Sequence, residues 1–452
     1  MYARTALFAL LSLSAVFGAS RAMAGANTAT DAANYMNCRR DVCAAGSKEA
    51  VLYSFQGAPD GQQPMGSLIA DKHGNLIGVT NIGGTGSCRS TDGAGCGTVF
   101  MLSPQGPGQW TESVIYSFQG GGDGQNPWQA PVFDEAGNLY GVTAEGGTGN
   151  CTNMNLSGCG TVFELSPQGN GSWTESVLYS FQGVPAGNGN GDAALPNSLV
   201  FDRSGNLFGF SSEGGSCSQK DRLAFCDGAA FEIERKHGSW REKIIYRPDG
   251  ATAVPAGALF DSTGNLYGVS PLGGSGGVGD VFELTPPSGK AQWAASVIYT
   301  FQNGPDGAIP VPGLLFDPQG NLFGASAGSD SVAANVFELT PGANNSWTES
   351  VLFGFNDGSI YPPRGPIMDG HGNLFGTTEF GGPAQSGNVY KGSQKGGRWT
   401  MRDLHDFGSG ADGSEPLGGL VFGKGGALYG TTVSGGTGIC RTGCGAVFRI
   451  KP

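Results

Sequence analysis

The chain has 452 residues, of which 82 are glycine and only 14% are charged. Its net charge is −12, and an acidic surface repels phosphate backbones, so we exclude nucleic acid as a partner. The glycines stand at fixed offsets between β-branched and aromatic runs, which is typical of turns rather than of disorder.

The N-terminus has the pattern of a secretory signal peptide. Arg4 supplies the basic region, an apolar run follows, and small residues up to Ala24 fit a cleavage site. The run is too short to span a bilayer comfortably. We predict a signal over residues 1–24, an extension over 25–48 and one domain over 49–452. The mature chain, cleaved near Ala24, is then a secreted or periplasmic monomer that makes no membrane contact.

The ten cysteines form five pairs that are close in sequence. An even number of cysteines in an exported chain favours disulfides, and the uneven intervals without accompanying histidines argue against zinc. The predicted pairs, the first of them in the N-terminal extension, are Cys38 with Cys43, Cys88 with Cys96, Cys151 with Cys159, Cys217 with Cys226, and Cys440 with Cys444.

One segment, Gly-Asn-Leu followed by an aromatic or aliphatic residue and Gly, recurs every 52 to 68 residues. A seventh, degraded copy contains Ala427. Such self-similarity predicts one supersecondary unit repeated seven times. The asparagines of the six intact copies are Asn75, Asn138, Asn206, Asn265, Asn321 and Asn373.

Each copy contains four short runs with the pattern of β-strands. In the second copy these are 110–118, 130–134, 138–143 and 161–166. No stretch keeps a helical period, and four antiparallel strands per repeat predict an all-β, seven-bladed β-propeller. The two strands that flank Gly-Asn-Leu are the inner strands a and b. The Val-Phe-Glu-Leu run is strand c, and the Trp to Tyr-Ser-Phe run is the outer strand d.

This assignment predicts how the ring closes. The first strand of the chain, 50–55, is of type d, and the last, 446–450, is of type c. The N-terminal strand should therefore complete the C-terminal blade, which leaves no unpaired edge between the ends of the ring.

The repeats resemble the GloVer tandem-repeat family of exported bacterial proteins. The matching run is Gly-Asn-Leu-Tyr-Gly-Val-Thr-x-x-Gly-Gly, then Gly-Thr-Val-Phe-Glu-Leu-Ser-Pro, then Val-Leu-Tyr-Ser-Phe, over about residues 49–451. Copy four departs from it at Arg247, and copy seven lacks the Asp-x-x-Gly-Asn turn. The resemblance implies a repeat architecture and export, and it implies no established activity.

The d–a and b–c loops should emerge on one face of the ring, and the a–b and c–d turns on the other. We interpret the Asp of each a–b turn as a turn cap rather than a cation ligand. The d–a/b–c face varies between copies, which suits recognition on a rigid scaffold. Its b–c loops carry the cysteine pairs of copies seven, one, two and three, which are neighbours in a closed ring. These bridges either preorganise a binding rim or only stabilise long loops.

Acidic residues occur on the same face. Glu145, Glu213 and Glu379 stand just before the Gly-Gly of copies two, three and six, and are candidate catalytic carboxylates. Acids of the d–a loops, mostly followed by Gly, are candidate ligand-binding residues, although Asp-Gly is first of all a turn signal. Ca²⁺ is an alternative ligand for them, and we otherwise expect no cofactor. They are Asp60, Asp123, Asp306, Asp357 and Asp412.

Six of the seven tryptophans hold one repeat position at the start of strand d, which predicts packing. Trp128 alone lies in a d–a loop, and Tyr361 lies in the comparable loop of copy six. An exposed Trp offers an apolar platform for a sugar ring, whereas burial against the next blade is the structural alternative. We predict binding of a polysaccharide or cell-envelope glycan on this face. A carbohydrate hydrolase or lyase and a protein–protein scaffold are the alternatives that the residues leave open.

Overall fold

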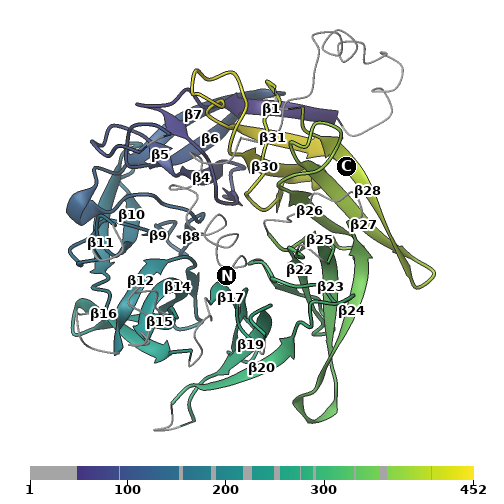
Figure 1. The fold of residues 1–452 in the computed structure, drawn as a ribbon. Coiled ribbons are helices and arrows are strands. Elements are labelled where there is room, and N and C mark those ends of the chain that lie inside the picture. Colours follow the sequence, from purple (N-terminus) through teal and green to yellow (C-terminus); the bar gives the residue numbers. More distant parts are fainter. Residues whose placement is uncertain are drawn as a thin grey trace, which may run out of the picture.

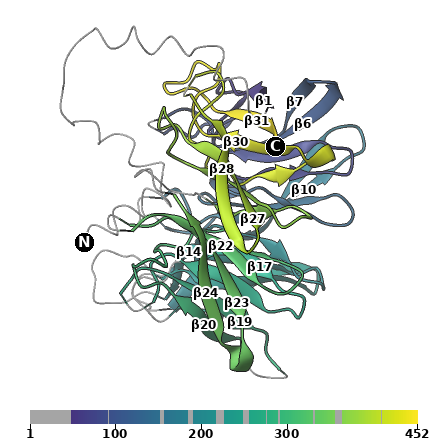
Figure 2. The ribbon, with the colours of Figure 1, turned by 90° about the vertical axis from the view of Figure 1, so that its right-hand side faces the viewer.

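The computed structural model describes residues 48–90, 92–151, 156–184, 190–216, 227–248, 255–274, 276–288, 292–329, 332–355, 364–408 and 410–452. Seven antiparallel sheets lie around a common centre (Figure 1). The view turned by 90° shows blade 7 at one end of the molecule and blade 4 at the other (Figure 2). The predicted seven-bladed propeller is confirmed.

Blades 1 to 6 hold strands a to d in chain order, from the centre outward. Blade 1 has β3 (Ile69–Ala70), β4 (Leu76–Thr80), β6 (Thr98–Gly106) and β7 (Gln109–Ser117). Blade 2 has β8 (Val132–Phe133), β9 (Leu139–Thr143), β10 (Thr161–Pro167) and β11 (Trp173–Ser180). Blade 3 has β13 (Val200–Phe201), β14 (Leu207–Ser216), β15 (Ala229–Lys236) and β16 (Ser239–Tyr246). Blade 4 has β17 (Ala256–Phe260), β18 (Leu266–Ser270), β19 (Asp280–Thr285) and β20 (Ala294–Thr300).

The remaining blades follow the same order. Blade 5 has β21 (Leu315–Phe316), β22 (Leu322–Ser326), β23 (Asn335–Pro341) and β24 (Trp347–Gly354). Blade 6 has β25 (Ile367–Met368), β26 (Leu374–Thr378), β27 (Asn388–Lys395) and β28 (Arg398–Asp406). Blade 7 has β29 (Val421–Phe422), β30 (Leu428–Thr432), β31 (Ala446–Lys451) and, from the other end of the chain, β1 (Lys48–Ser54).

The closure of the ring is therefore the one predicted. β1 pairs antiparallel with β31, from Lys48 opposite Lys451 to Ser54 opposite Ala446. The strand that follows the N-terminal extension thus supplies the outer strand of the last blade.

A few elements lie outside the four-strand pattern. β12 (Asn190–Pro196), in the d–a loop before blade 3, pairs with β14, and β2 (Gly61–Gln62) pairs with β5 (Ile82–Gly83). Short 3-10 turns are η1 (Gly121–Asp123), η3 (Ala343–Asn345) and η4 (Lys424–Gly426). The described residues contain no helix with the length and hydrophobicity needed to cross a membrane.

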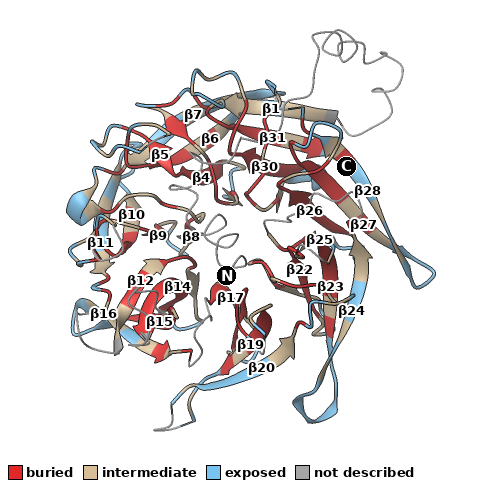
Figure 3. Cartoon of the chain, viewed as in Figure 1, coloured by how far each residue is buried: buried red, intermediate tan, exposed pale blue. Residues whose placement is uncertain are grey.

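The core lies between blades, where aromatic rings of strands c and d meet. Figure 3 shows the buried residues concentrated on the inner strands, with the outer strands more exposed. Phe118, which follows β7, meets Phe163 of the next blade edge to face at 5.1 Å. The second Gly of the repeat leaves room for the strand c ring, because a Cβ on Gly141 would lie 2.4 Å from the Phe163 ring. The repeated tryptophans seal the same interfaces, as Trp110 does against Tyr429 of blade 7 at 5.8 Å.

The a–b turns are capped as predicted. Asp134 accepts hydrogen bonds from the backbone N–H of Asn138 at 2.8 Å and from its side-chain amide at 2.8 Å. The same pair of bonds forms in the other five intact copies. These carboxylates hold the hairpin between strands a and b, which accounts for the Asp and Asn of the repeat.

Candidate functional site

The d–a loops and b–c loops meet at seams between neighbouring blades. The residue before the proline that precedes strand a has a left-handed backbone in blades 1, 2, 3, 5 and 7, a conformation that side-chain-bearing residues adopt rarely. Its N–H donates to a carbonyl in the b–c loop of the preceding blade, as Asn126 does to Cys96 at 2.9 Å. These residues, with their φ, are Gln63 (58°), Asn126 (58°), Leu195 (53°), Ile309 (55°) and Glu415 (58°).

Disulfides lie at three of these seams. The bonds Cys88–Cys96, Cys151–Cys159 and Cys440–Cys444 form as predicted, with Cα atoms 5.0, 5.3 and 5.1 Å apart. The next d–a loop passes directly over each bridge, so that a Cβ on Gly120 would lie 2.7 Å from the Cys88 sulfur. The predicted pairs Cys38 with Cys43 and Cys217 with Cys226 lie outside the described residues.

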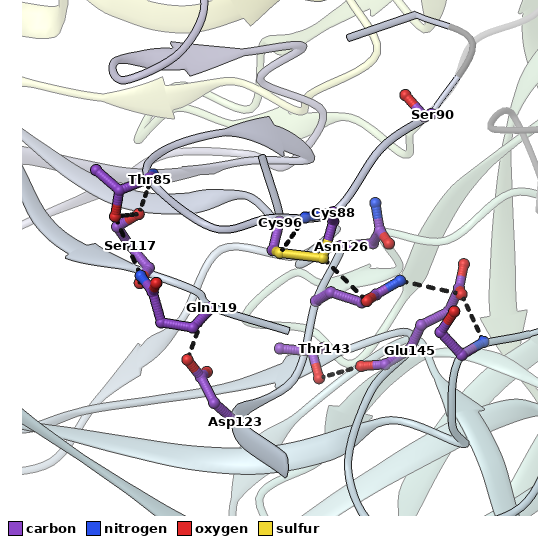
Figure 4. The surroundings of a disulfide bond; sticks show 12 residues. Thr85, Cys88, Ser90, Cys96, Ser117, Gln119, Asp123, Asn126, Thr143 and Glu145 are labelled. Carbon is purple, nitrogen blue, oxygen red and sulfur yellow. Dashed lines mark hydrogen bonds between the residues drawn. A yellow bond between two sulfur atoms is a disulfide. The ribbon is translucent and has the colours of Figure 1, made fainter. Parts of the chain in front are cut away.

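Glu145 forms hydrogen bonds that hold the b–c loop of blade 2 near the Cys88–Cys96 disulfide (Figure 4). Its Oε2 accepts hydrogen bonds from Gln125 Nε2 at 3.3 Å and from the Ser157 backbone N–H at 3.2 Å. The Oε1 of the same Gln125 lies 3.1 Å from the Cys88 sulfur. Burial raises the pKa of Glu145, and the two hydrogen bonds oppose that rise. Glu213, only 8% exposed, lies in β14 opposite Ala194 of β12.

Glu379 does not hold the repeat position of Glu145, and the expected equivalence is wrong. Thr378 pairs with Asn388 as Thr143 pairs with Thr161, so Glu379 directly follows the last paired residue and corresponds to Ala144. Successive residues of an extended chain face opposite sides. The one-residue difference therefore turns the Glu379 side chain toward the next blade.

There Glu379 meets a second carboxylate that the sequence analysis missed. Glu379 is 6% exposed, and burial, together with the charge of Glu415 of the next d–a loop, raises its pKa to about 8. Glu415 accepts a hydrogen bond from Ser434 Oγ at 3.1 Å. Burial raises the pKa of Glu415, which that hydrogen bond opposes. One sequence signal could have revealed Glu415: it is an acidic residue directly before the proline that precedes strand a, where blades 1 and 2 have the neutral Gln63 and Asn126.

An amide cluster occupies the corresponding seam between blades 1 and 2. Buried Asn81 accepts from the indole N–H of Trp128 at 2.9 Å and from Asn126 Nδ2 at 3.3 Å, and donates to Gln63 Oε1 at 3.4 Å. Trp128 is partly exposed. Its backbone lies against Gly66 of blade 1, where a Cβ would approach the Trp128 carbonyl to 3.0 Å.

A small buried apolar cluster links the acidic pair to the amide cluster. Met65 of blade 1 packs with Leu417 and Val433 of blade 7, between the two polar groups. We call the whole set the inner-rim arc, and it crosses blades 6, 7, 1 and 2. Its members are Glu379, Glu415, Leu417, Val433, Met65, Gln63, Asn81, Asn126 and Trp128.

The d–a loop aspartates lie elsewhere, at the ends of the outer strands. Asp60 accepts from Tyr53 Oη at 2.9 Å and from the Gln56 backbone N–H at 2.9 Å. Asp123 and Asp306 repeat both bonds, and Asp412 accepts from a backbone N–H and lies 3.4 Å from His405. Asp357 and Tyr361 are outside the described residues. Within the described part of the chain, no three His, Cys, Asp or Glu side chains gather to hold a metal ion.

The ring of four-stranded blades, with d–a and b–c loops interlocked on one face, defines the protein as a seven-bladed β-propeller with a variable rim. The model of the Gloeobacter/Verrucomicrobia repeat matches residues 41–219, 149–346 and 325–452. The chain belongs to this family.

Comparison with solved structures supports the fold. Virginiamycin B lyase from Staphylococcus aureus superposes with a TM-score of 0.52 at 11% identity, covering 90% of this chain and 99% of the lyase. The extracellular domain of a putative hybrid two-component system from B. thetaiotaomicron has a TM-score of 0.52 at 10% identity, over 90% of this chain and 43% of that one. Such low identities show the fold alone. No curated protein matches the chain.

Proposed function

We propose that this protein is exported and binds an extracellular glycan, a polysaccharide or a cell-envelope sugar polymer, through the inner-rim arc. One observation carries the proposal: the partly exposed Trp128 is fixed by its indole N–H to Asn81. An aromatic face held in place beside amide groups suits the apolar face and the hydroxyl groups of a sugar ring. The disulfides are in keeping with export.

The arc is also preorganised, which lowers the entropic cost of binding. Gln63 and Asn126 have left-handed backbones, tied by N–H bonds to Cys444 and Cys96 of the stapled b–c loops. Asn81 is 3% exposed and bonds to both amides and to the indole. The buried Asn81 thus holds the partly exposed Gln63, Asn126 and Trp128 in place, and a ligand that contacts these three orders few side chains.

The test is a glycan array, followed by titration of the polymers that bind. Trp128→Ala removes the aromatic face and should weaken binding at least about tenfold, in line with about 1.4 kcal/mol per tenfold change. Trp128→Phe keeps an aromatic ring without the N–H and should retain part of the affinity. The Trp128→Ala variant should melt within a few degrees of the wild type. Unchanged affinity in Trp128→Ala, or an array without any bound glycan, would refute the proposal.

The Glu379–Glu415 pair favours a second candidate, a carbohydrate hydrolase or lyase. A carboxyl that stays protonated near neutral pH can act as a general acid, and an ionised carboxyl beside it can act as a general base. The raised pKa of Glu379, about 8, meets the first requirement. Release of new reducing ends or unsaturated products from a bound glycan, abolished by Glu379→Gln with binding retained, would support this candidate. Absence of any product from a glycan that binds would remove it.

A further inference from the structure

The same three-residue chain crosses five of the seven blade interfaces. In four sets a tyrosine on strand d of one blade donates its hydroxyl to the Asp of the following d–a loop, and in the fifth His405 Nε2 lies 3.4 Å from Asp412. Each Asp interacts electrostatically with a Glu on strand d of the next blade. The five sets are Tyr53, Asp60 and Glu112; Tyr116, Asp123 and Glu175; Tyr179, Asp192 and Glu242; Tyr299, Asp306 and Glu349; and His405, Asp412 and Glu49.

The Asp of each set is held by hydrogen-bond donors. Asp192, for example, accepts from Tyr179 Oη at 2.9 Å, from the Gln182 backbone N–H at 2.7 Å and from the Ala193 backbone N–H at 2.8 Å. Donors of this kind favour the ionised carboxylate. Asp123 differs in one respect, because its Oδ1 is buried without a partner among the described residues and burial raises its pKa.

The Glu of each set has the opposite surroundings. In all five, Oε1 is buried and has no hydrogen-bond partner among the described residues. A buried carboxylate oxygen that lacks a donor strongly favours protonation. A protonated Glu can donate its O–H to the Asp, and the interaction of the Glu242 carboxyl with the Asp192 carboxyl is one of the causes that raise the pKa of Glu242.

The charged groups around each Glu are few. Asp60 faces Glu112, Asp123 faces Glu175, and Asp306 faces Glu349. Two pairs have a cation in addition: Arg247 beside the pair of Glu242 and Asp192, and Arg449 beside the pair of Glu49 and Asp412. Each cation opposes the effect of the Asp without cancelling it.

Burial first, and the facing Asp second, raise the pKa of four glutamates from an ordinary 4.5 to about 7, namely Glu49, Glu112, Glu175 and Glu349. The pKa of Glu242 is raised by the same causes. A folded-state pKa above the unfolded value means that the stabilisation is fully present below about pH 4.5 and is lost as the pH rises through about 7.

Two blades provide an internal comparison. At the position of the strand d Glu, blade 4 has Ala295 and blade 6 has Met401, which stand opposite strand c as Glu175 does in blade 2. The interfaces on which these residues lie have no such Glu to protonate. A blade interface can therefore form without the carboxyl pair.

We propose that the five carboxyl pairs, which we call clasps, are proton-dependent contacts between neighbouring blades. A proton shared between Glu and Asp stabilises the blade interface below neutral pH, and loss of that proton above neutral pH destabilises it. The clasps act at the outer ends of the interfaces and are distinct from the inner-rim arc. The proposal therefore stands whether or not a glycan binds there.

The test is the pH dependence of unfolding, measured by denaturant titration at intervals from pH 5 to pH 8.5. The wild-type midpoint should fall across this range, with about three to five protons released on unfolding near pH 6. The variant with all five glutamates changed to Gln keeps a neutral donor toward each Asp. It should lose the part of the slope that the five glutamates supply, while Glu379 and Asp280, whose pKa values burial also raises, keep their share. It should match or exceed wild-type stability at pH 8.

Glu164→Gln is the matched control, because Glu164 bonds to Tyr140 and Ser166 within its own blade. It should leave the slope unchanged. If the fivefold variant does not fold, Glu112→Gln and Glu175→Gln singly should each remove about one proton from the slope. A slope that stays at the wild-type value in these variants, or wild-type stability that rises between pH 5 and pH 8, would overturn the proposal.

Discussion

Tyr390 carries the one hydroxyl group in a row of interface rings that are otherwise phenylalanine. It holds the strand c position of Phe163 and Phe337, and its ring is 0% exposed. Its Oη has no hydrogen-bond partner among the described residues. A Cβ on Gly376 would lie 2.3 Å from that oxygen, so the hydroxyl sits against the backbone of strand b.

Tyr390→Phe should therefore stabilise the protein. A buried hydroxyl without a partner costs about 1–3 kcal/mol, and removing the oxygen alone leaves the ring packing against Phe355 and Phe353 in place. We expect the free energy of unfolding to rise by about 1 kcal/mol. For a domain of this size that corresponds to only about 1–2 °C in Tm, so denaturant titration at fixed pH is the better assay.

The reciprocal substitution Phe337→Tyr is the control. It places a hydroxyl against Gly324, where the Phe337 ring already leaves only 2.4 Å to a Cβ position, and should destabilise by about 1–3 kcal/mol. A loss of stability in Tyr390→Phe would show that a buried water satisfies the hydroxyl, and the reasoning from an unpaired group would then be refuted.

Two further predictions concern the closure of the ring and the caps of the a–b turns. Removing residues 49–56 deletes the outer strand of blade 7, so the truncated chain should lose its cooperative thermal transition by circular dichroism, and a wild-type melt would contradict the closure by β1. Hydrogen bonds from Asn265, Thr263 and Gly264 lower the pKa of Asp261 despite its partial burial, so the stability that this cap supplies is present above its ordinary pKa and is lost as the pH falls below about 4. Asp261→Ala should cost about 1 kcal/mol at pH 6 and much less at pH 3, and an equal cost at both pH values would disprove the role of the charge.

The architecture could be predicted from the sequence because every element of the repeat has one local cause. The Asp of each a–b turn accepts hydrogen bonds from Asn138 or its counterpart, and Gly141 leaves room for the Phe163 ring. The type d strand at the N-terminal end of the domain pairs with the type c strand at its C-terminal end. These are short-range or pairwise rules, and they act in each copy alike. Cysteine pairing at short intervals was predictable for the same reason.

The candidate site was harder to predict because it depends on register and on contacts between copies. Glu379 differs from Glu145 by one residue, which turns it from its own b–c loop to the neighbouring blade. Glu415 becomes significant only beside Glu379, and Trp128 only beside Asn81. Separations of tens of residues in the chain gave no signal of either contact. The d–a aspartates were recognised as turn residues, but their bond to the strand d tyrosine was not foreseen.

Two repeat positions account for most of the inner-rim arc, and their side chains vary with a pattern around the ring. The position before the strand a proline has Gln63, Asn126 and Glu415 in blades 1, 2 and 7, and Leu195 and Ile309 in blades 3 and 5. The position after strand b has Asn81 and Glu379 in blades 1 and 6. Because the backbone is the same at each seam, polarity is set by the side chain alone. Exchanging Asn126 for Leu should therefore keep the backbone of the seam, remove the side-chain hydrogen bonds to Asn81 and weaken glycan binding, whereas exchanging Leu195 for Asn should leave binding unchanged.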